Sequence, residues 1–154
     1  MQVGLYVVGR PRDGALAEVI AGYETRAARY WPLAVVEVRE AGTRGGDAEG
    51  TRRLEGERLL ERIPTRAELV ACDPGGEVLD SAAFAAWLRD RRDRAQDVAF
   101  VIGGAYGLSE AVRGRARRRL SLAPWTLPHE LARLVLAEQL YRAGTIARGE
   151  PYHK

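Results

Sequence analysis

The sequence predicts an α/β domain with a mainly parallel sheet and helices on both faces. Short apolar runs alternate with longer amphipathic segments along the chain, which is typical of repeated strand–helix units. The run 98–102 (Val-Ala-Phe-Val-Ile) carries no polar residue, as expected of a strand buried on both faces of a parallel sheet. The 154 residues contain no repeat or linker, so we predict a single domain over residues 1–154.

The first fifty residues predict two strands, a helix and a loop. Residues 2–8 and 33–38 are short runs rich in Val and Leu and are expected to be strands. Between them apolar residues recur at helical spacing to about residue 29, and Asp13 is placed to cap that helix. Glycines crowd residues 40–50, so we expect a mobile surface loop there.

The middle of the chain predicts a second helix, a third strand and a tight turn. Residues 51–62 are expected to form a charged helix. Its inward side carries three leucines, Leu54, Leu59 and Leu60. The apolar run 67–72 is expected to be a strand, and the Asp-Pro-Gly-Gly sequence at 73–76 predicts the turn that ends it.

Two helices and two strands are predicted next. Ser81 can cap a helix that ends near residue 92, and residues 97–102 form the fourth strand. After a glycine-rich bend, Ser109 can cap a short basic helix that reaches residue 119. Residues 120–122 are then left to form a fifth, very short strand.

The chain ends in a long predicted helix over residues 129–148 and a non-helical tail over residues 149–154. The apolar stripe of this helix is wider than one contact with a sheet requires. A subunit interface on the helix is therefore a hypothesis.

Composition narrows the classes of protein. Cys72 is the only cysteine, which excludes an intrachain disulfide and a cysteine-rich zinc site, so no metal is expected. The chain has neither a secretory signal nor an apolar run long enough to cross a bilayer, so we predict a cytoplasmic protein with no membrane partner. The net charge is +3, and the positive excess lies in the C-terminal half.

Three loops follow predicted strands and are the candidate ligand site. In an open α/β sheet, ligands bind beyond the carboxyl ends of the strands, which here means residues 72–76, 103–107 and 122–128. The last of these is apolar and contains two prolines, so it either forms a wall for an adenine ring or is a packed loop that covers the edge of the sheet. Neither a phosphate-binding P-loop nor a dinucleotide fingerprint is present, which argues against nucleoside triphosphate hydrolysis and NAD chemistry.

An arginine run and two histidines complete the candidate residues. The run is either a solvated charged face or a phosphate-contacting patch, and it consists of Arg113, Arg115, Arg117, Arg118 and Arg119. His129 and His153 are the only histidines, and histidine is the side chain most easily tuned for proton transfer near neutral pH.

Several of these segments, in this order, resemble a known family. They are Ile102-Gly103-Gly104 with Gly107-Leu108-Ser109, Leu120-Ser121-Leu122 with Thr126-Leu127-Pro128-His129, Arg133 with Glu138-Gln139 and Tyr141-Arg142-Ala143, and Pro151-Tyr152-His153-Lys154. The pattern is similar to the RlmH type of ribosomal RNA methyltransferase, a small, single-domain branch of the SPOUT superfamily. It is dense over about residues 98–154, and the chain length and the glycine-rich loop fit along the rest.

The resemblance implies a C-terminal trefoil knot that binds S-adenosylmethionine (SAM), the methyl donor. No local pattern predicts such threading, because knots are nearly absent among folds. The positions that match the methyl-donor pocket are Cys72, Gly103, Gly104, Leu122, Ala123, Pro124, Trp125, Thr126 and Leu127.

The resemblance also implies a substrate and an assembly. Family members methylate N3 of a pseudouridine in large-subunit (23S) rRNA, on the assembled ribosome and as homodimers. The residues that match the family's functional helix and tail are His129, Arg133, Tyr152 and His153. We expect Tyr152 or His153 near the target base, with the base that takes the proton left open between His129 and His153. Contacts with RNA are expected from Arg115, Arg118, Arg119 and Arg142, while Arg133 and Arg142 hold phosphates or developing negative charge.

Three alternatives remain open at this point. A SPOUT enzyme that methylates another RNA, such as tRNA, would share the donor pocket. A non-catalytic ribosome-associated factor would need the arginine-rich segment but no donor pocket. A flavodoxin-like flavin protein has the same class of sheet.

Overall fold

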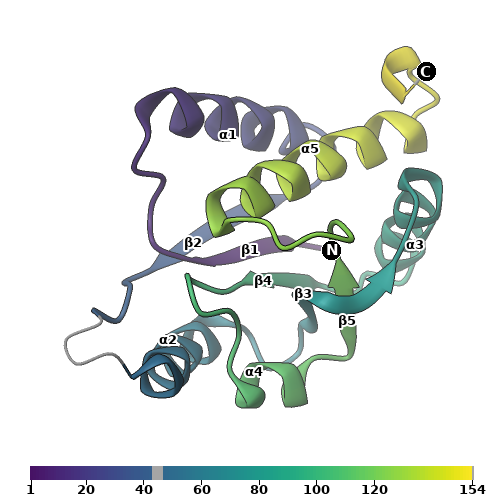
Figure 1. Ribbon diagram of the computed structural model, residues 1–154. Coiled ribbons are helices and arrows are strands. Elements are labelled where there is room, and N and C mark those ends of the chain that lie inside the picture. Colours follow the sequence, from purple (N-terminus) through teal and green to yellow (C-terminus); the bar gives the residue numbers. More distant parts are fainter. Residues whose placement is uncertain (43–46, 154) are drawn as a thin grey trace.

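The fold is built on five parallel strands in the order β2-β1-β4-β3-β5 (Figure 1). The computed structural model describes residues 1–42 and 47–152 and the backbone of His153. The strands are β1 (Val3–Val8), β2 (Leu33–Val38), β3 (Glu68–Val78), β4 (Val98–Ile102) and β5 (Arg118–Ser121). Every residue of β1 and β4 is buried, because these central strands are covered on both faces. The predicted α/β class with a parallel sheet is confirmed.

Helices cover both faces of the sheet, as Figure 1 shows. One face carries α1 (Gly14–Ala27), α3 (Ser81–Asp93) and α5 (His129–Ala147), and the other carries α2 (Ala48–Arg62) and α4 (Glu110–Arg115). A short 3-10 turn, η1 (Pro151–His153), follows α5. None of the helices described has the length and apolar character of a membrane span.

Helix α5 lies across the face that also carries α1 and α3, and it fills the larger of two apolar cores. Leu136 and Leu140 are fully buried there among residues of the sheet and of α3. The Trp31 indole donates a hydrogen bond of 2.8 Å to the Leu140 carbonyl, which ties the end of α1 to α5. A Cβ at position 144 would overlap the Tyr30 ring, so the close approach of the two helices requires Gly144.

Strand β3 corrects one sequence prediction. The predicted turn at 73–76 is wrong, because β3 continues through these residues to Val78. Its register with β5 shifts between Cys72 and Glu77, which marks a bulge rather than a chain reversal. Gly76 lies flat against β5, where a Cβ would come within 2.5 Å of the Arg119 carbonyl carbon. The Pro-Gly-Gly signal therefore marks a close approach of two backbones.

The basic helix also differs from expectation. Ser109 caps α4 as predicted and accepts a hydrogen bond of 3.3 Å from the Val112 N–H. The helix nevertheless ends at Arg115, and Arg118 and Arg119 lie in β5 instead. Pairing with β3 accounts for this, since Arg119 takes its place opposite Ala71.

Three smaller predictions are wrong. Leu54 is 38% exposed, whereas Leu59 is buried as predicted, because α2 begins at Ala48 behind an Asp47 cap. Asp80, rather than Ser81, caps α3 by accepting a hydrogen bond of 2.7 Å from the Ala83 N–H. The tail contains a 3-10 turn where no helix was expected. The central part of the predicted glycine-rich loop, residues 43–46, lies outside the described residues.

Replacing Leu136 tests the packing of α5 on the sheet. We expect Leu136→Ala to lower the free energy of unfolding by about 2–5 kcal/mol, because it leaves a cavity in a fully buried layer. Val19→Ala on α1 is the control, since its 47% exposed side chain should contribute less than about 1 kcal/mol. Urea denaturation measures both, and equal losses would contradict this packing.

Candidate functional site

A cleft opens at the carboxyl ends of β3 and β4, where the three loops singled out in the sequence meet. Of the residues predicted for a methyl-donor pocket, all but Pro124 line it. These lining residues are Cys72, Gly103, Gly104, Leu122, Ala123, Trp125, Thr126 and Leu127, and their contact with the methyl donor stays a prediction. Segments distant in sequence are thus brought together by the parallel sheet.

The loop after β4 forms one wall of the cleft from its own backbone. Gly107 has a φ of +80° and donates a hydrogen bond of 3.0 Å to the Gly104 carbonyl, so the loop folds back on itself. A Cβ on Gly103 would come within 2.6 Å of the Gly107 carbonyl carbon. Glycine is therefore needed for the loop geometry, and the wall presents main-chain groups to a ligand.

Two groups of β3 give the cleft a nearly neutral floor. Burial raises the pKa of the Cys72 thiol to about 12, so the thiol stays protonated at neutral pH. Burial opposes ionisation of Asp73, but the Gly75 N–H at 2.8 Å and the Arg113 guanidinium at 2.7 Å outweigh it and lower the pKa of Asp73. The carboxylate and the guanidinium balance each other at the edge of the cleft.

His129 stands at the first turn of α5 and lines the cleft. It also lines a small crevice between the ends of β1 and β4. Strand β1 continues to β2 on one side, whereas β4 continues to β5 on the other, so the crevice is the point where the winding of the sheet reverses. Ligand sites of open α/β sheets lie at such a point.

Tyr152 lies at the opposite end of α5 from His129. Its hydroxyl donates a hydrogen bond of 3.1 Å to Glu138, and its ring packs on Tyr141 with 4.5 Å between centroids. Burial, the main cause, and hydrogen bonds with Tyr23 and Glu138 raise the pKa of Tyr152, which keeps it protonated. Glu138 is nine residues from His129, about 14 Å along a helix. Within one chain, the tail and the cleft are thus separate.

The side chain of His153, the other predicted catalytic histidine, lies outside the described residues. Arg133 is buried and holds two carboxylates, with hydrogen bonds of 2.7 Å to Glu24 and 2.8 Å to Glu37. The carboxylates engage Nε, Nη1 and Nη2 of Arg133, so a direct contact with RNA would compete with them for the guanidinium.

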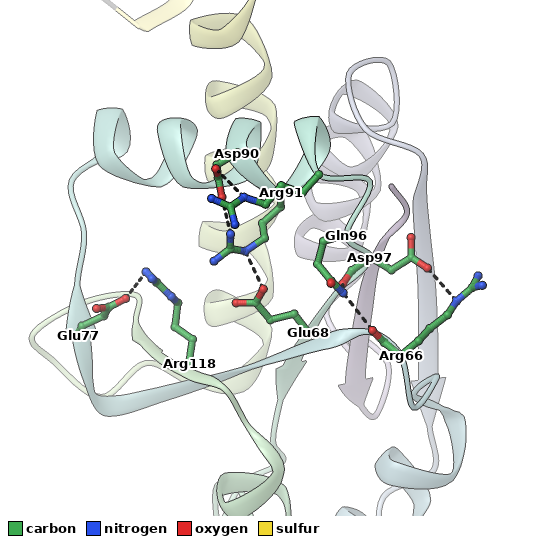
Figure 2. Close-up of polar contacts among 9 residues, drawn as sticks. Arg66, Glu68, Glu77, Asp90, Arg91, Gln96, Asp97 and Arg118 are labelled. Atoms are coloured by element: carbon green, nitrogen blue, oxygen red, sulfur yellow. Dashed lines mark hydrogen bonds and ion pairs between the residues drawn. The ribbon is translucent and has the colours of Figure 1, made fainter.

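The predicted RNA-contacting arginines all have partners within the chain. Arg118 pairs with Glu77 of β3, as Figure 2 shows, and stacks on the Trp87 ring at 5.1 Å. Arg119 lies 3.3 Å from Asp73, and Arg115 donates to the Pro64 carbonyl at 3.0 Å. Arg142 binds Glu138 at 2.6 Å and covers the Tyr152 ring. Their predicted contacts with RNA are not tested by these intrachain pairs.

Some cleft residues were missed as site residues. Arg113 was noticed only as part of the arginine run, and its place in the cleft follows from the bulge that brings Asp73 toward α4. Ala132 lines the cleft one turn into α5, which no motif indicated. No group of three or more His, Cys, Asp or Glu side chains suited to a metal occurs within the part of the chain that the structure describes.

Comparison with known proteins agrees with this geometry. The family described as "Predicted SPOUT methyltransferase" matches residues 1–153. A protein of Gemmatimonas aurantiaca named ribosomal RNA large subunit methyltransferase H is 64% identical over the full length of both chains. One of the same name from Anaeromyxobacter sp. (strain K) is 48% identical, again over both full lengths.

Solved structures support the fold. The crystal structure of a probable methyltransferase from Bordetella pertussis Tohama I superimposes with a TM-score of 0.52 at 20% identity, over 92% of this chain and 95% of that one. A crystal structure described as a hypothetical protein gives a TM-score of 0.53 at 18% identity, over 96% and 89% of the two chains. With a full-length family match and close relatives along its whole length, the chain belongs to the SPOUT methyltransferase family.

Proposed function

We propose that this protein transfers a methyl group from SAM to large-subunit rRNA. The observation that carries the proposal is the cleft of backbone-rich loops in a chain that matches rRNA methyltransferases over its whole length. The finer assignment, N3 of a pseudouridine in the assembled ribosome, is part of the proposal and is supported by the resemblance of the tail and the final helix to the RlmH type.

The residues of the cleft fit a methyl-sulfonium nucleoside. The Gly103–Gly107 wall offers main-chain hydrogen bonds, and Leu122–Leu127 offers an apolar wall for an adenine ring. A neutral Cys72 and a balanced Asp73–Arg113 pair leave little net charge to repel a sulfonium cation. SAM, when bound, supplies an activated methyl group.

The protein's own residues then have to align the reactants and accept the proton that leaves the target nitrogen. The residues that line the cleft would hold the donor and orient its methyl group toward the target nitrogen. The imide N3 bears a proton that must leave, and His129 or His153 takes it in this proposal. Arg133 and Arg142 hold phosphates or the developing negative charge, provided that their carboxylate partners release them.

A homodimer would reconcile the separated cleft and tail. Tyr152 packs beside Glu138 and Tyr141 of α5, whereas the cleft lies at the first turn of that helix, so the two are apart within one chain. A two-fold interface that places α5 of two copies side by side in opposite directions would set the tail of each copy beside the cleft of the other. The trefoil knot remains a prediction that follows from the family resemblance.

Radiolabelled methyl transfer tests the substrate. We expect label in the large-subunit rRNA of assembled ribosomes and little in free rRNA or tRNA. Raising the salt from 50 to 200 mM should weaken binding by about tenfold or more, because phosphate contacts release counterions. Label in tRNA alone would indicate an enzyme for another RNA. Ribosome binding without heat on titration with SAM would indicate a non-catalytic factor.

Two histidine variants test the proton acceptor. The variant that removes it, either His129→Ala or His153→Ala, should lower the single-turnover rate by about 10²–10⁴-fold. The other variant serves as its control and should stay near the wild-type rate across pH 6–9. Wild-type rates in both variants would exclude the histidines from the proton pathway.

Mixed dimers test whether two chains share the site. Gly103→Ala should abolish donor binding in its own cleft, and Tyr152→Ala should disable only the tail. If the tail serves the neighbouring cleft, mixing the two inactive variants restores roughly a quarter of wild-type activity, because half of the dimers carry one intact site. Sedimentation of a fully active monomer would contradict the shared site.

A further inference from the structure

Glu55 is a buried acidic residue that the proposed reaction does not use. It lies on α2, on the face of the sheet opposite α5, and is only 4% exposed. Its Oε1 accepts a hydrogen bond of 3.1 Å from the Ala41 N–H, just beyond the end of β2. Its Oε2 is buried and has no hydrogen-bond partner among residues 1–42 and 47–152. An unpartnered buried oxygen of this kind is rare and calls for a reason.

The unpartnered oxygen is directed at the loop that walls the cleft. A Cβ built on Gly104 would come within 2.7 Å of the Glu55 Oε2 and within 3.1 Å of a Val8 methyl group. Gly104 also lines the cleft. The loop is thus held between the ligand space on one side and a carboxyl oxygen on the other.

The next residue of α2 supports the same loop at its far end. A Cβ on Gly56 would overlap the Ser109 hydroxyl, which caps α4. Successive residues of α2 therefore contact both ends of the connection between β4 and α4. These contacts with α2 fix the position of the loop.

The carboxyl group is an unfavourable choice for stability alone. Burial is the main cause that raises the pKa of Glu55, and the neighbouring Glu40 adds to it, while the Ala41 N–H, Arg58 and His129 oppose it. Since the unfolded chain ionises more easily than the folded one, this residue favours unfolding as the pH rises through its raised pKa. Stability alone therefore does not account for a carboxyl group at this position.

We propose that Glu55 is a positioning residue: it is the stop against which the Gly103–Gly107 loop rests, and it thereby sets the width of the methyl-donor cleft. The proposal rests on the proposed function, because it takes SAM as the ligand of that cleft. Glu55 touches the loop from behind and has no contact with the ligand space. A Cβ at position 104 would come within 2.7 Å of Oε2, so a larger residue there requires the carboxyl group or the loop to move.

A double-mutant cycle read by calorimetric titration with SAM tests this role. Glu55→Ala removes the stop, and Gly104→Ala drives a methyl group against it, so each should weaken SAM binding by about tenfold. In Glu55→Ala/Gly104→Ala the new methyl group fills the vacated space. The double variant should therefore bind SAM more tightly than either single variant, within about threefold of wild type.

Conservative and matched controls separate positioning from general destabilisation. Glu55→Gln keeps the shape and the acceptor for the Ala41 N–H, so SAM affinity should stay within about threefold of wild type. Glu57→Gln, in an exposed ion pair with Arg53 on the same helix, and Gly114→Ala, on α4 with open space around it in the described structure, should change nothing.

The outcomes distinguish the two levels of the proposal. Additive losses in the double variant, or wild-type affinity in Gly104→Ala, would overturn the role of Glu55. A wild-type protein that gives no heat with SAM would overturn the proposed function. In that case the midpoint of thermal unfolding still reports the contact between Glu55 and Gly104. Gly104→Ala should lower this midpoint, and adding Glu55→Ala in the double variant should raise it again.

Discussion

Contact between backbones without intervening side chains is the constraint on which the cleft depends. Gly76 lies against β5 and Gly103 lies against Gly107, and in both places a Cβ would come within about 2.6 Å of carbonyl atoms. The first contact lets β3 continue past its bulge, and the second folds the loop after β4 on itself. Together they bring main-chain groups, rather than long side chains, to the ligand. Under the proposed function, these main-chain groups would form the hydrogen bonds to the nucleoside of SAM.

Charge is distributed so that the cleft stays nearly neutral while arginines tie elements together. Arg113 and Arg119 both approach Asp73, and Arg133 bridges α1 and β2 through its two carboxylates. The excess positive charge of the C-terminal half is thus largely paired with carboxylates of the same chain. Under the proposed function, RNA phosphates would most easily replace the partners of exposed arginines, because exposed ion pairs contribute little to stability.

The sequence predicted the elements that depend on local patterns and missed those that depend on distant partners. The second strand begins and ends where expected, because its apolar run and the preceding Pro32 are local signals. The end of α4 and the course of β3 were wrong, since both are decided by pairing between β3 and β5. Most of the cleft could be predicted, because strand ends in a parallel sheet meet at one edge. Glu55 could not, as nothing in the sequence places it behind Gly104.

Helix α5 acts as a spacer of fixed length. Its first turn carries His129 into the cleft and its last turns carry the aromatic cluster that holds Tyr152. Removal of one residue from its middle would shorten it by about 1.5 Å and rotate everything beyond that point by about 100°. Gly144 would then turn away from Tyr30 and a larger side chain would face that ring. The register of this helix is therefore fixed by its contacts at both ends.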